Sequence, residues 1–185
     1  SMRENNGAVR FLFVGAVRQM KGISYLLEAF ETVNPESAHL EIVGDCMIPD
    51  RLQHKNASNI EYLGYLLPET VANRYKDADV FVFPSLCDGF GLAALEAMAS
   101  GLPVICSANS GVADLIQDGV NGFVVETGDA GELRDRIVWF TEHRDRMKDM
   151  KRAAMETGRN YSWEKYEDNV NRAVIEMIQR KYRNG

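Results

Sequence analysis

Short apolar segments that carry almost no charge alternate along this chain with segments whose apolar residues recur at helical spacing. The first pair is VRFLFVG, which starts at Val9, and the helical segment GISYLLEAFETV that follows it. Further strand-like segments lie at residues 40–44, 60–64, 79–85, 103–107 and 122–126. Nearly uncharged strands are typical of parallel sheets that helices cover on both faces. The alternation therefore predicts an α/β fold with a Rossmann-like, doubly wound and mainly parallel sheet.

Beyond the last strand-like segment the sequence changes to a charge-dense helical pattern. The pattern predicts a helix over residues 132–150, a break near Gly158 and a closing helix over residues 162–182. Ser162 is expected to begin the closing helix as its N-cap. The sequence has no internal repeat and no linker rich in Pro, Gly or Ser. We therefore expect residues 1–185 to form a single domain, with the closing helix peripheral to it.

Composition and charge exclude several classes of function. The 185 residues are 45% hydrophobic and 26% charged, as expected for one globular domain with a sizeable core. The net charge of −6 argues against the broad positive field that nucleic-acid binding uses. The sequence has neither an apolar run of about 18 residues nor a signal-peptide layout at its N-terminus. We therefore expect no nucleic-acid partner and no membrane-spanning segment.

Neither the cysteines nor the histidines indicate a metal ion, and we expect no cofactor. The cysteines form an odd set without a two-residue spacing, which indicates neither a disulfide framework nor a zinc site and favours a reducing cytoplasm: Cys46, Cys87 and Cys106. The histidines lack a carboxylate or cysteine partner at ligand spacing, and we interpret them as surface or strand-flanking residues: His39, His54 and His143.

The most distinctive local feature is PSLCDGFGLAALEAMASGLPVICS, at residues 84–107. Pro84 ends a strand because proline cannot donate to a central sheet ladder. Gly89 and Gly91 then allow a close backbone approach at the start of a helix. Exposed N–H groups and the helix dipole favour an anion such as a phosphate there.

Glu96 is the only charged residue between residues 89 and 113. Because helical side chains lean toward the helix N-terminus, its carboxylate can accept hydrogen bonds from the vicinal hydroxyls of a ribose bound there. The alternative interpretation is that Glu96 lies on a solvated stripe of a packed helix.

The loop VGAVRQMKG, at residues 14–22, places Arg18 and Lys21 between a strand end and a helix. Ligands of open parallel sheets bind at the carboxyl ends of the strands, where such loops lie. Both side chains suit a diphosphate and would stabilise the charge of a leaving group in glycosyl transfer. The alternative is that Arg18 and Lys21 are solvated loop charges, as most exposed basic residues are, although the absence of acidic residues between residues 5 and 27 argues against it.

The fragment GFGLAA, at residues 89–94, also matches the dinucleotide-binding fingerprint G-x-G-x-x-A. That fingerprint requires the first strand of a βαβ unit and an acidic residue about 20 positions later. Here the next strand ends in Ser107-Ala108-Asn109 instead. A dehydrogenase is therefore a distant alternative, which NAD binding would test.

The segment from Pro84 to Asp129 resembles the signature region of glycosyltransferase family 4, whose members have the two-domain GT-B fold. FLFVGAVRQMKGISYLLEAF is similar to that family's opening strand, phosphate loop and helix, and YSWEKYEDNV to its closing helix. The resemblance implies the C-terminal half of a GT-B enzyme, a domain that binds a nucleoside-diphosphate sugar. It also implies transfer of a hexose-type sugar with retention of configuration, and no metal ion.

The resemblance implies a set of donor-binding residues: Gly15, Arg18, Lys21, Asp88, Gly89, Phe90, Gly91, Leu92 and Glu96. Glu96 would hold the ribose, and Asp88 with the backbone of residues 89–92 would face the sugar and the diphosphate. Lys21 matches the family's diphosphate lysine. Asp88 and Lys21 are thus the catalytic residues that the resemblance implies.

The sequence departs from the family pattern at three places. Asp88 replaces a glutamate, so its reach is shorter by one methylene, and Asp114 likewise stands where the family commonly has glutamate. Ala16 stands where an arginine usually follows the loop glycine, and we hypothesise that Arg18 substitutes for it.

The acceptor in this family is a glycan or a lipid-linked sugar, and it binds an N-terminal domain that has no counterpart here. We therefore expect a cytoplasmic protein of polysaccharide biosynthesis that can contact the inner face of a membrane, and an isolated domain that transfers no sugar. A GT-B-like nucleotide-sugar epimerase and a non-enzymatic nucleotide-sugar-binding module are the alternatives. Epimerisation without an acceptor would support the first, and a folded protein without donor affinity would indicate the second.

Overall fold

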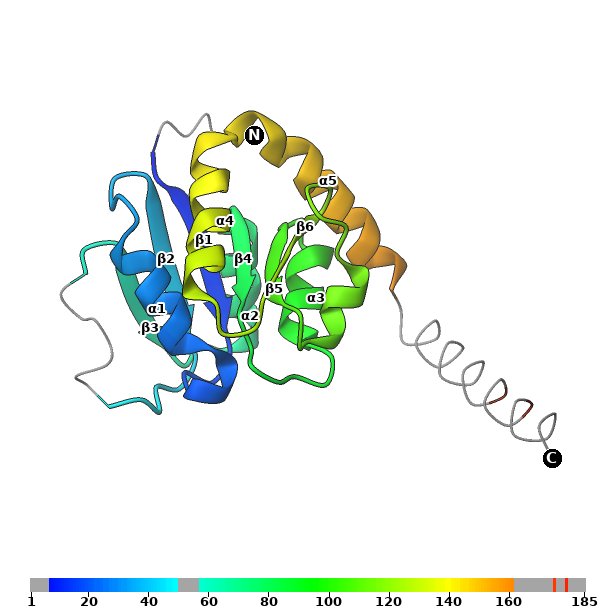
Figure 1. The fold of residues 1–185 in the computed structure, drawn as a ribbon, viewed down its shortest axis with the longest axis horizontal. Coiled ribbons are helices and arrows are strands. Elements are labelled where there is room, and N and C mark those ends of the chain that lie inside the picture. The colour runs from blue at the N-terminus through cyan, green and yellow to red at the C-terminus, as the bar shows by residue number, and fades with distance from the viewer. Residues whose placement is uncertain (1–6, 50–56, 162–174, 176–178, 180–185) are drawn as a thin grey trace.

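The computed structural model describes residues 7–49 and 57–161, together with Ile175 and Gln179. Within these residues the chain forms a six-stranded parallel sheet with helices on both faces (Figure 1). The strands are β1 (Val9–Val14), β2 (Ala38–Val43), β3 (Ile60–Gly64), β4 (Val80–Phe83), β5 (Val104–Ser107) and β6 (Gly122–Val125). Their order is β3-β2-β1-β4-β5-β6, so the winding reverses between β1 and β4. The predicted Rossmann-like, doubly wound sheet is confirmed.

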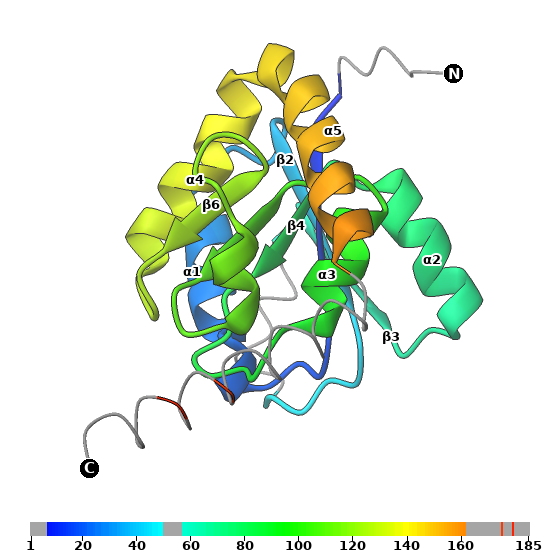
Figure 2. The same cartoon turned by 90° about the vertical axis from the view of Figure 1, so that its right-hand side faces the viewer.

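The helices divide between the two faces of the sheet, as Figure 2 shows. One face packs against α1 (Ile23–Glu31) and α4 (Ala130–Glu142), whose apolar residues join the larger core cluster. The other face packs against α2 (Pro68–Asp77) and α3 (Leu92–Ala99). Alternation along β1 explains the division, because Phe11 and Phe13 belong to the first cluster and Leu12 to the second.

The last described helix, α5 (Arg144–Asn160), packs against α3. The predicted break near Gly158 is confirmed to within two residues, because α5 continues through this glycine and ends at Asn160. A Cβ at position 158 would come within 2.3 Å of the backbone nitrogen of Ala99. Gly158 therefore permits the close contact between the two helices.

The predicted helix over residues 132–150 is wrong as a single element, because α4 and α5 meet at His143. The backbone there leaves the helical region, with φ −119° and ψ 50°. The imidazole stacks on Trp139, with ring centroids 4.6 Å apart, and its Nδ1 lies 2.9 Å from the Trp139 carbonyl oxygen. The His143 side chain thus pairs with a backbone carbonyl in the last turn of α4, and the helix ends without the glycine or proline that marks many helix ends.

The predicted closing helix over residues 162–182, with Ser162 as its N-cap, lies outside the described residues except for Ile175 and Gln179. Within the part of the chain that is described, no helix combines the length and the hydrophobicity that crossing a membrane requires.

Candidate functional site

The loops after β1 and β4 touch each other at the carboxyl edge of the sheet, since these two strands are neighbours. The loop after β1 contains the short 3-10 helix η1 (Gln19–Lys21) and ends at Gly22, where φ is 71°. A Cβ at position 22 would lie 1.8 Å from the carbonyl oxygen of Pro84. The Leu86 N–H donates to the Met20 carbonyl oxygen at 2.9 Å. Glycine at position 22 therefore permits the contact that brings Lys21 to the start of α3.

Three buried serines fix these loops to one another. The Ser85 hydroxyl shares its hydrogen between the carbonyl oxygens of Met20 and Cys87, at 3.2 and 3.3 Å. The Ser107 hydroxyl donates to the Ser85 carbonyl oxygen, and the Ser110 hydroxyl donates to the Ser107 carbonyl oxygen at 2.8 Å. These hydrogen bonds were not predicted from the sequence. The signal that could have indicated them is the serine found at the end of each of two neighbouring strands.

Lys21 and Asp88, predicted as catalytic residues, form an ion pair with each other. The Lys21 Nζ donates to Asp88 Oδ2, and the two side chains are only 21% and 16% exposed. Asp88 Oδ1 also accepts the backbone N–H of Phe90 at 3.3 Å. The ammonium lies 5.7 Å from the ring centroid of Phe83. Both charged groups are therefore held in place at the mouth of α3.

The start of α3 leaves backbone donors available. Gly91 precedes the helix with φ 91°, and its Cβ would lie 2.8 Å from the Phe83 ring, so only glycine fits without strain. A Cβ at Gly89, by contrast, would face open space. In the described part of the chain, the N–H groups of Gly89, Gly91 and Leu92 have no hydrogen-bond acceptor. Such donors, with the helix dipole behind them, suit an anion.

A cavity of about 720 Å³ opens beside this helix start, between α2, α3 and the ends of β1 and β2. Its wall is mostly apolar and includes Gly15, Asp45, Tyr65 and Glu96. Glu96 is exposed, as the solvated-stripe alternative requires, but the side of α3 that it occupies is the cavity wall. The structure thus brings Gly15 and Glu96 to one cavity.

Arg18 is the predicted donor-binding residue that the structure places apart from the others. Its side chain is exposed, does not line the cavity, and makes no hydrogen bond or ion pair with the described residues. Its backbone is extended at the start of η1. The substitution of Arg18 for the arginine missing at Ala16 therefore stays a prediction.

Tyr75 was missed by sequence reasoning, although it contacts a predicted site residue. It lies on α2 and is only 4% exposed. Its hydroxyl lies 3.2 Å from Glu96 Oε2. Only the packing of α2 beside α3 creates this contact, since 21 residues separate the two in sequence.

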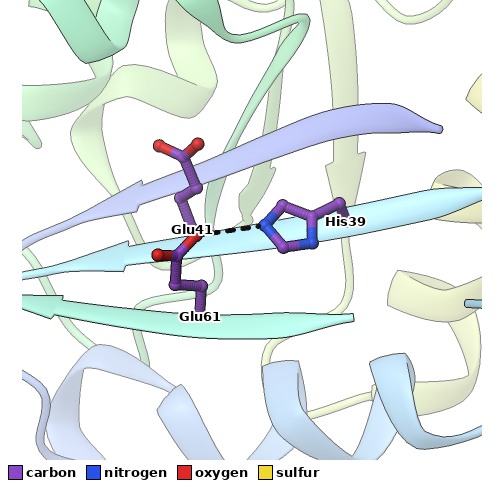
Figure 3. Close-up of side chains that lie close together, drawn as sticks. All are labelled: His39, Glu41 and Glu61. Atoms are coloured by element: carbon purple, nitrogen blue, oxygen red, sulfur yellow. Dashed lines mark ion pairs between the residues drawn. The ribbon is translucent and has the colours of Figure 1, made fainter. Parts of the chain in front are cut away.

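His39 does have carboxylate neighbours, so the prediction that it lacks them is wrong. The side chains of His39 and Glu61 point toward one another from β2 and β3, with Nε2 3.5 Å from Glu61 Oε2 (Figure 3). Glu41 lies two residues along β2 and pairs with Glu61 in the strand register. An imidazole and two carboxylates suit Zn²⁺, and one ligand atom from each residue lies within 4.8 Å of the others. Arg74, however, already lies 3.5 Å from Glu41 and supplies a cation to this cluster.

The cysteines are free among the described residues. Cys46 and Cys87 are exposed, and Cys106 is buried in β5. Burial raises the pKa of the Cys106 thiol to about 12, so this thiol stays protonated and packs as an apolar group. His54 lies outside the described residues.

The model of the family "Glycosyl transferases group 1" matches residues 2–157. An uncharacterized glycosyltransferase of Methanocaldococcus jannaschii is 29% identical over 178 residues, which cover 94% of this chain and 50% of that protein. The C-terminal domain of a glycosyl transferase group 1 family protein from Francisella tularensis superposes with a TM-score of 0.73 at 24% identity, covering 80% of this chain and 83% of that one. Anabaena HepE in complex with UDP-glucose superposes with a TM-score of 0.72 at 21% identity, covering 82% of this chain and 44% of that one.

The chain therefore belongs to the group 1 glycosyltransferase family. Its likeness to solved glycosyltransferases confirms the predicted GT-B type of fold. The chain spans about half the length of the curated relatives it matches, 50% and 46% for two of them.

Proposed function

We propose that this domain binds a nucleoside-diphosphate sugar as the donor-binding part of a retaining, family 4 glycosyltransferase. The observation that carries the proposal is the layout of α3. Its start presents unpaired N–H groups beside Lys21, and Glu96 lines the cavity one turn later. The step of four residues from Leu92 to Glu96 spans about 6 Å along a helix. That spacing is comparable with the distance between the diphosphate and the ribose hydroxyls of one nucleotide.

The nucleotide is proposed to lie along this line. The diphosphate binds the N–H groups of Gly89, Gly91 and Leu92, where the helix dipole and Lys21 add positive charge. The ribose hydroxyls donate to Glu96. The base occupies the apolar remainder of the cavity, near Tyr65. A cavity of about 720 Å³ is large enough for a nucleoside, since ligand pockets of about 300–1,000 Å³ are typical.

The chemistry assigned to the full protein follows from this placement. The bond between the anomeric carbon and the phosphate oxygen breaks, and an acceptor hydroxyl oxygen bonds to that carbon and releases its proton to solvent. The nucleoside diphosphate leaves with an additional negative charge. Lys21 and the N–H groups at the start of α3 lie where that charge develops, and stabilise it in a partly buried site. These groups supply the charge compensation for which other enzymes use a metal ion, so we propose that none is needed. Asp88, held by Lys21 and Phe90 N–H, faces the hexose-type sugar.

We propose that the acceptor, a glycan or a lipid-linked sugar, binds another domain of the full protein. The support is the family membership and the length of the relatives, of which this chain spans about half. We expect the 185-residue chain alone to bind donor weakly and to transfer no sugar. Transfer to an acceptor by this chain alone would contradict that expectation.

Titration calorimetry with UDP-, GDP- and ADP-sugars tests donor binding. Lys21→Ala and Glu96→Ala each remove a hydrogen bond to a charged group, worth about 1.5–3 kcal/mol, and should weaken binding at least tenfold. Lys148→Ala is the matched control, because it removes an exposed lysine from α5. If no donor binds at millimolar concentration, even to the full-length protein, the proposal fails.

Two further measurements separate the remaining alternatives. Arg18→Ala weakens donor binding if Arg18 substitutes for the arginine that is missing at Ala16, and leaves it unchanged otherwise. Incubation of the full protein with donor alone, followed by NMR of the sugar, detects an epimerase. The proposed transferase leaves the stereochemistry of the sugar unchanged when no acceptor is present. With acceptor, it gives a product that retains the anomeric configuration of the donor.

A further inference from the structure

Tyr75 lies between α2 and the sheet with its hydroxyl directed at α3. Its ring packs against Phe81, with centroids 5.8 Å apart and ring planes tilted by 52°. The residue is only 4% exposed. The hydroxyl lies 3.2 Å from Glu96 Oε2 and 3.2 Å from the Ala93 carbonyl oxygen. The buried ring therefore fixes the position of a polar atom at the edge of the cavity.

The Tyr75 hydroxyl can act here only as a donor. Both neighbouring oxygens are acceptors, and they share the single hydroxyl hydrogen. Burial raises the pKa of Tyr75 well above its usual value, and the nearby Glu96 charge raises it further. The hydroxyl consequently keeps its proton at all physiological pH values.

The contact divides the two oxygens of Glu96 between two tasks. Oε2 is held by Tyr75. Oε1 has no hydrogen-bond partner in the described part of the chain. Glu96 is otherwise an exposed side chain with several rotatable bonds, which would lose rotamer freedom on binding a ligand. Tyr75 restricts that freedom before the ligand arrives, which favours binding.

We propose that Tyr75 is a positioning residue that aims the free Glu96 oxygen at the ribose, and so sets the preference of the site for ribonucleoside over deoxyribonucleoside diphosphates. This inference rests on the proposed function, because it requires that a nucleotide occupies the cavity. It adds a residue of α2 that never touches the nucleotide itself. It also assigns the sugar selectivity of the nucleotide to a pair of side chains, Tyr75 and Glu96.

The test compares UDP and GDP with their 2′-deoxy counterparts by titration calorimetry on the protein and its Tyr75→Phe variant. The wild type should prefer the ribonucleotide about tenfold, the size expected for one hydrogen bond to a charged group. Tyr75→Phe should reduce this preference to about threefold or less while the affinity for the deoxy ligand stays unchanged. A merely structural role would weaken both ligands equally, which would overturn the proposal.

A double-mutant cycle sharpens the test. In the Glu96→Ala background, Tyr75→Phe should have no further effect on the preference, since the tyrosine acts through the carboxylate. Tyr25→Phe is the control, because it removes a hydroxyl from α1 on the other face of the sheet. Thermal unfolding of each variant reports any loss of folding separately.

The outcomes distinguish this inference from the proposed function. If neither UDP nor GDP binds the wild type, both fail. If the wild type binds a ribonucleotide and its deoxy counterpart equally, donor binding stands but Glu96 does not hold the ribose, and the inference is overturned. An undiminished preference in Tyr75→Phe overturns it as well.

Discussion

Replacing Asp88 by asparagine should change stability and ligand affinity in opposite directions. The Lys21–Asp88 pair is mostly buried, with side-chain exposures of 21% and 16%. Its contribution to the free energy of unfolding should lie between that of a surface ion pair and that of a fully buried one, at about 1–2 kcal/mol. Loss of that amount should lower the melting temperature by about 2–8 °C for a domain of this size.

The same substitution frees the Lys21 ammonium at the mouth of α3. In the native protein Asp88 neutralises it, whereas in Asp88→Asn the site carries one more net positive charge. If a bound diphosphate gains about 1 kcal/mol from its attraction to the freed ammonium, UDP binding tightens about fivefold. The gain should shrink at high salt, because ions screen a partly exposed site. Sugar transfer by the full-length protein should fall nevertheless, since Asp88 is proposed to face the sugar.

Lys21→Met is the matched comparison for this prediction. It breaks the same ion pair and should lower the melting temperature similarly, but it leaves the Asp88 charge to repel the diphosphate. UDP binding, followed by calorimetry at low and high salt, should therefore weaken at least tenfold. If Asp88→Asn weakens UDP binding as much as Lys21→Met does, the carboxylate does not compete with the diphosphate for Lys21, and the reasoning is wrong.

Four further predictions concern the glycines and the buried cysteine. Gly22→Ala, at φ 71°, would place a Cβ 1.8 Å from a carbonyl oxygen and should lower the free energy of unfolding in urea by about 2–4 kcal/mol. Gly64→Ala has a similar φ of 66° but open space around its Cβ, so it should lower that free energy by only about 1–2 kcal/mol. Gly158→Ala should lower the free energy of unfolding by about 1–3 kcal/mol, because its Cβ would push α5 away from α3; an unchanged urea midpoint would contradict this packing. The pKa of the Cys106 thiol is about 12 in the folded protein, against 9.0 for an ordinary thiol. The buried neutral thiol therefore contributes its full stabilisation below pH 9.0, and this contribution is lost as the pH rises toward 12. A thiol reagent at pH 8 should label the two exposed cysteines rapidly and Cys106 only on unfolding; rapid labelling of Cys106 would refute its burial.

The sheet and the first half of the site could be predicted because both depend on local sequence. Nearly uncharged strands indicate a sheet that is covered on both faces, and the carboxyl ends of such strands converge. This rule brought Lys21 and Asp88 to the same edge before the structure showed their ion pair. The sequence also predicted Gly91 at the start of a helix, and the structure places it directly before α3.

The contacts that the sequence did not indicate depend on register and on helix packing. Glu61 reaches His39 only through the pairing of β2 with β3. Tyr75 reaches Glu96 because α2 and α3 lie side by side on one face of the sheet. The helix end at His143 was missed because a stacked imidazole replaces the usual glycine there. Periodicity along one element contains no information about such contacts between elements.

The most direct test of donor binding is to follow the backbone amide resonances of the protein by NMR during titration with UDP-glucose and GDP-mannose. The largest shifts should fall on Gly89, Gly91 and Leu92, whose N–H groups have no acceptor in the described part of the chain. Smaller shifts are expected around Glu96 and Lys21. Saturable shifts at these positions would support a nucleotide sugar at the start of α3. If neither ligand shifts them at millimolar concentration, or if the shifts map to the opposite edge of the sheet, the central claim is wrong.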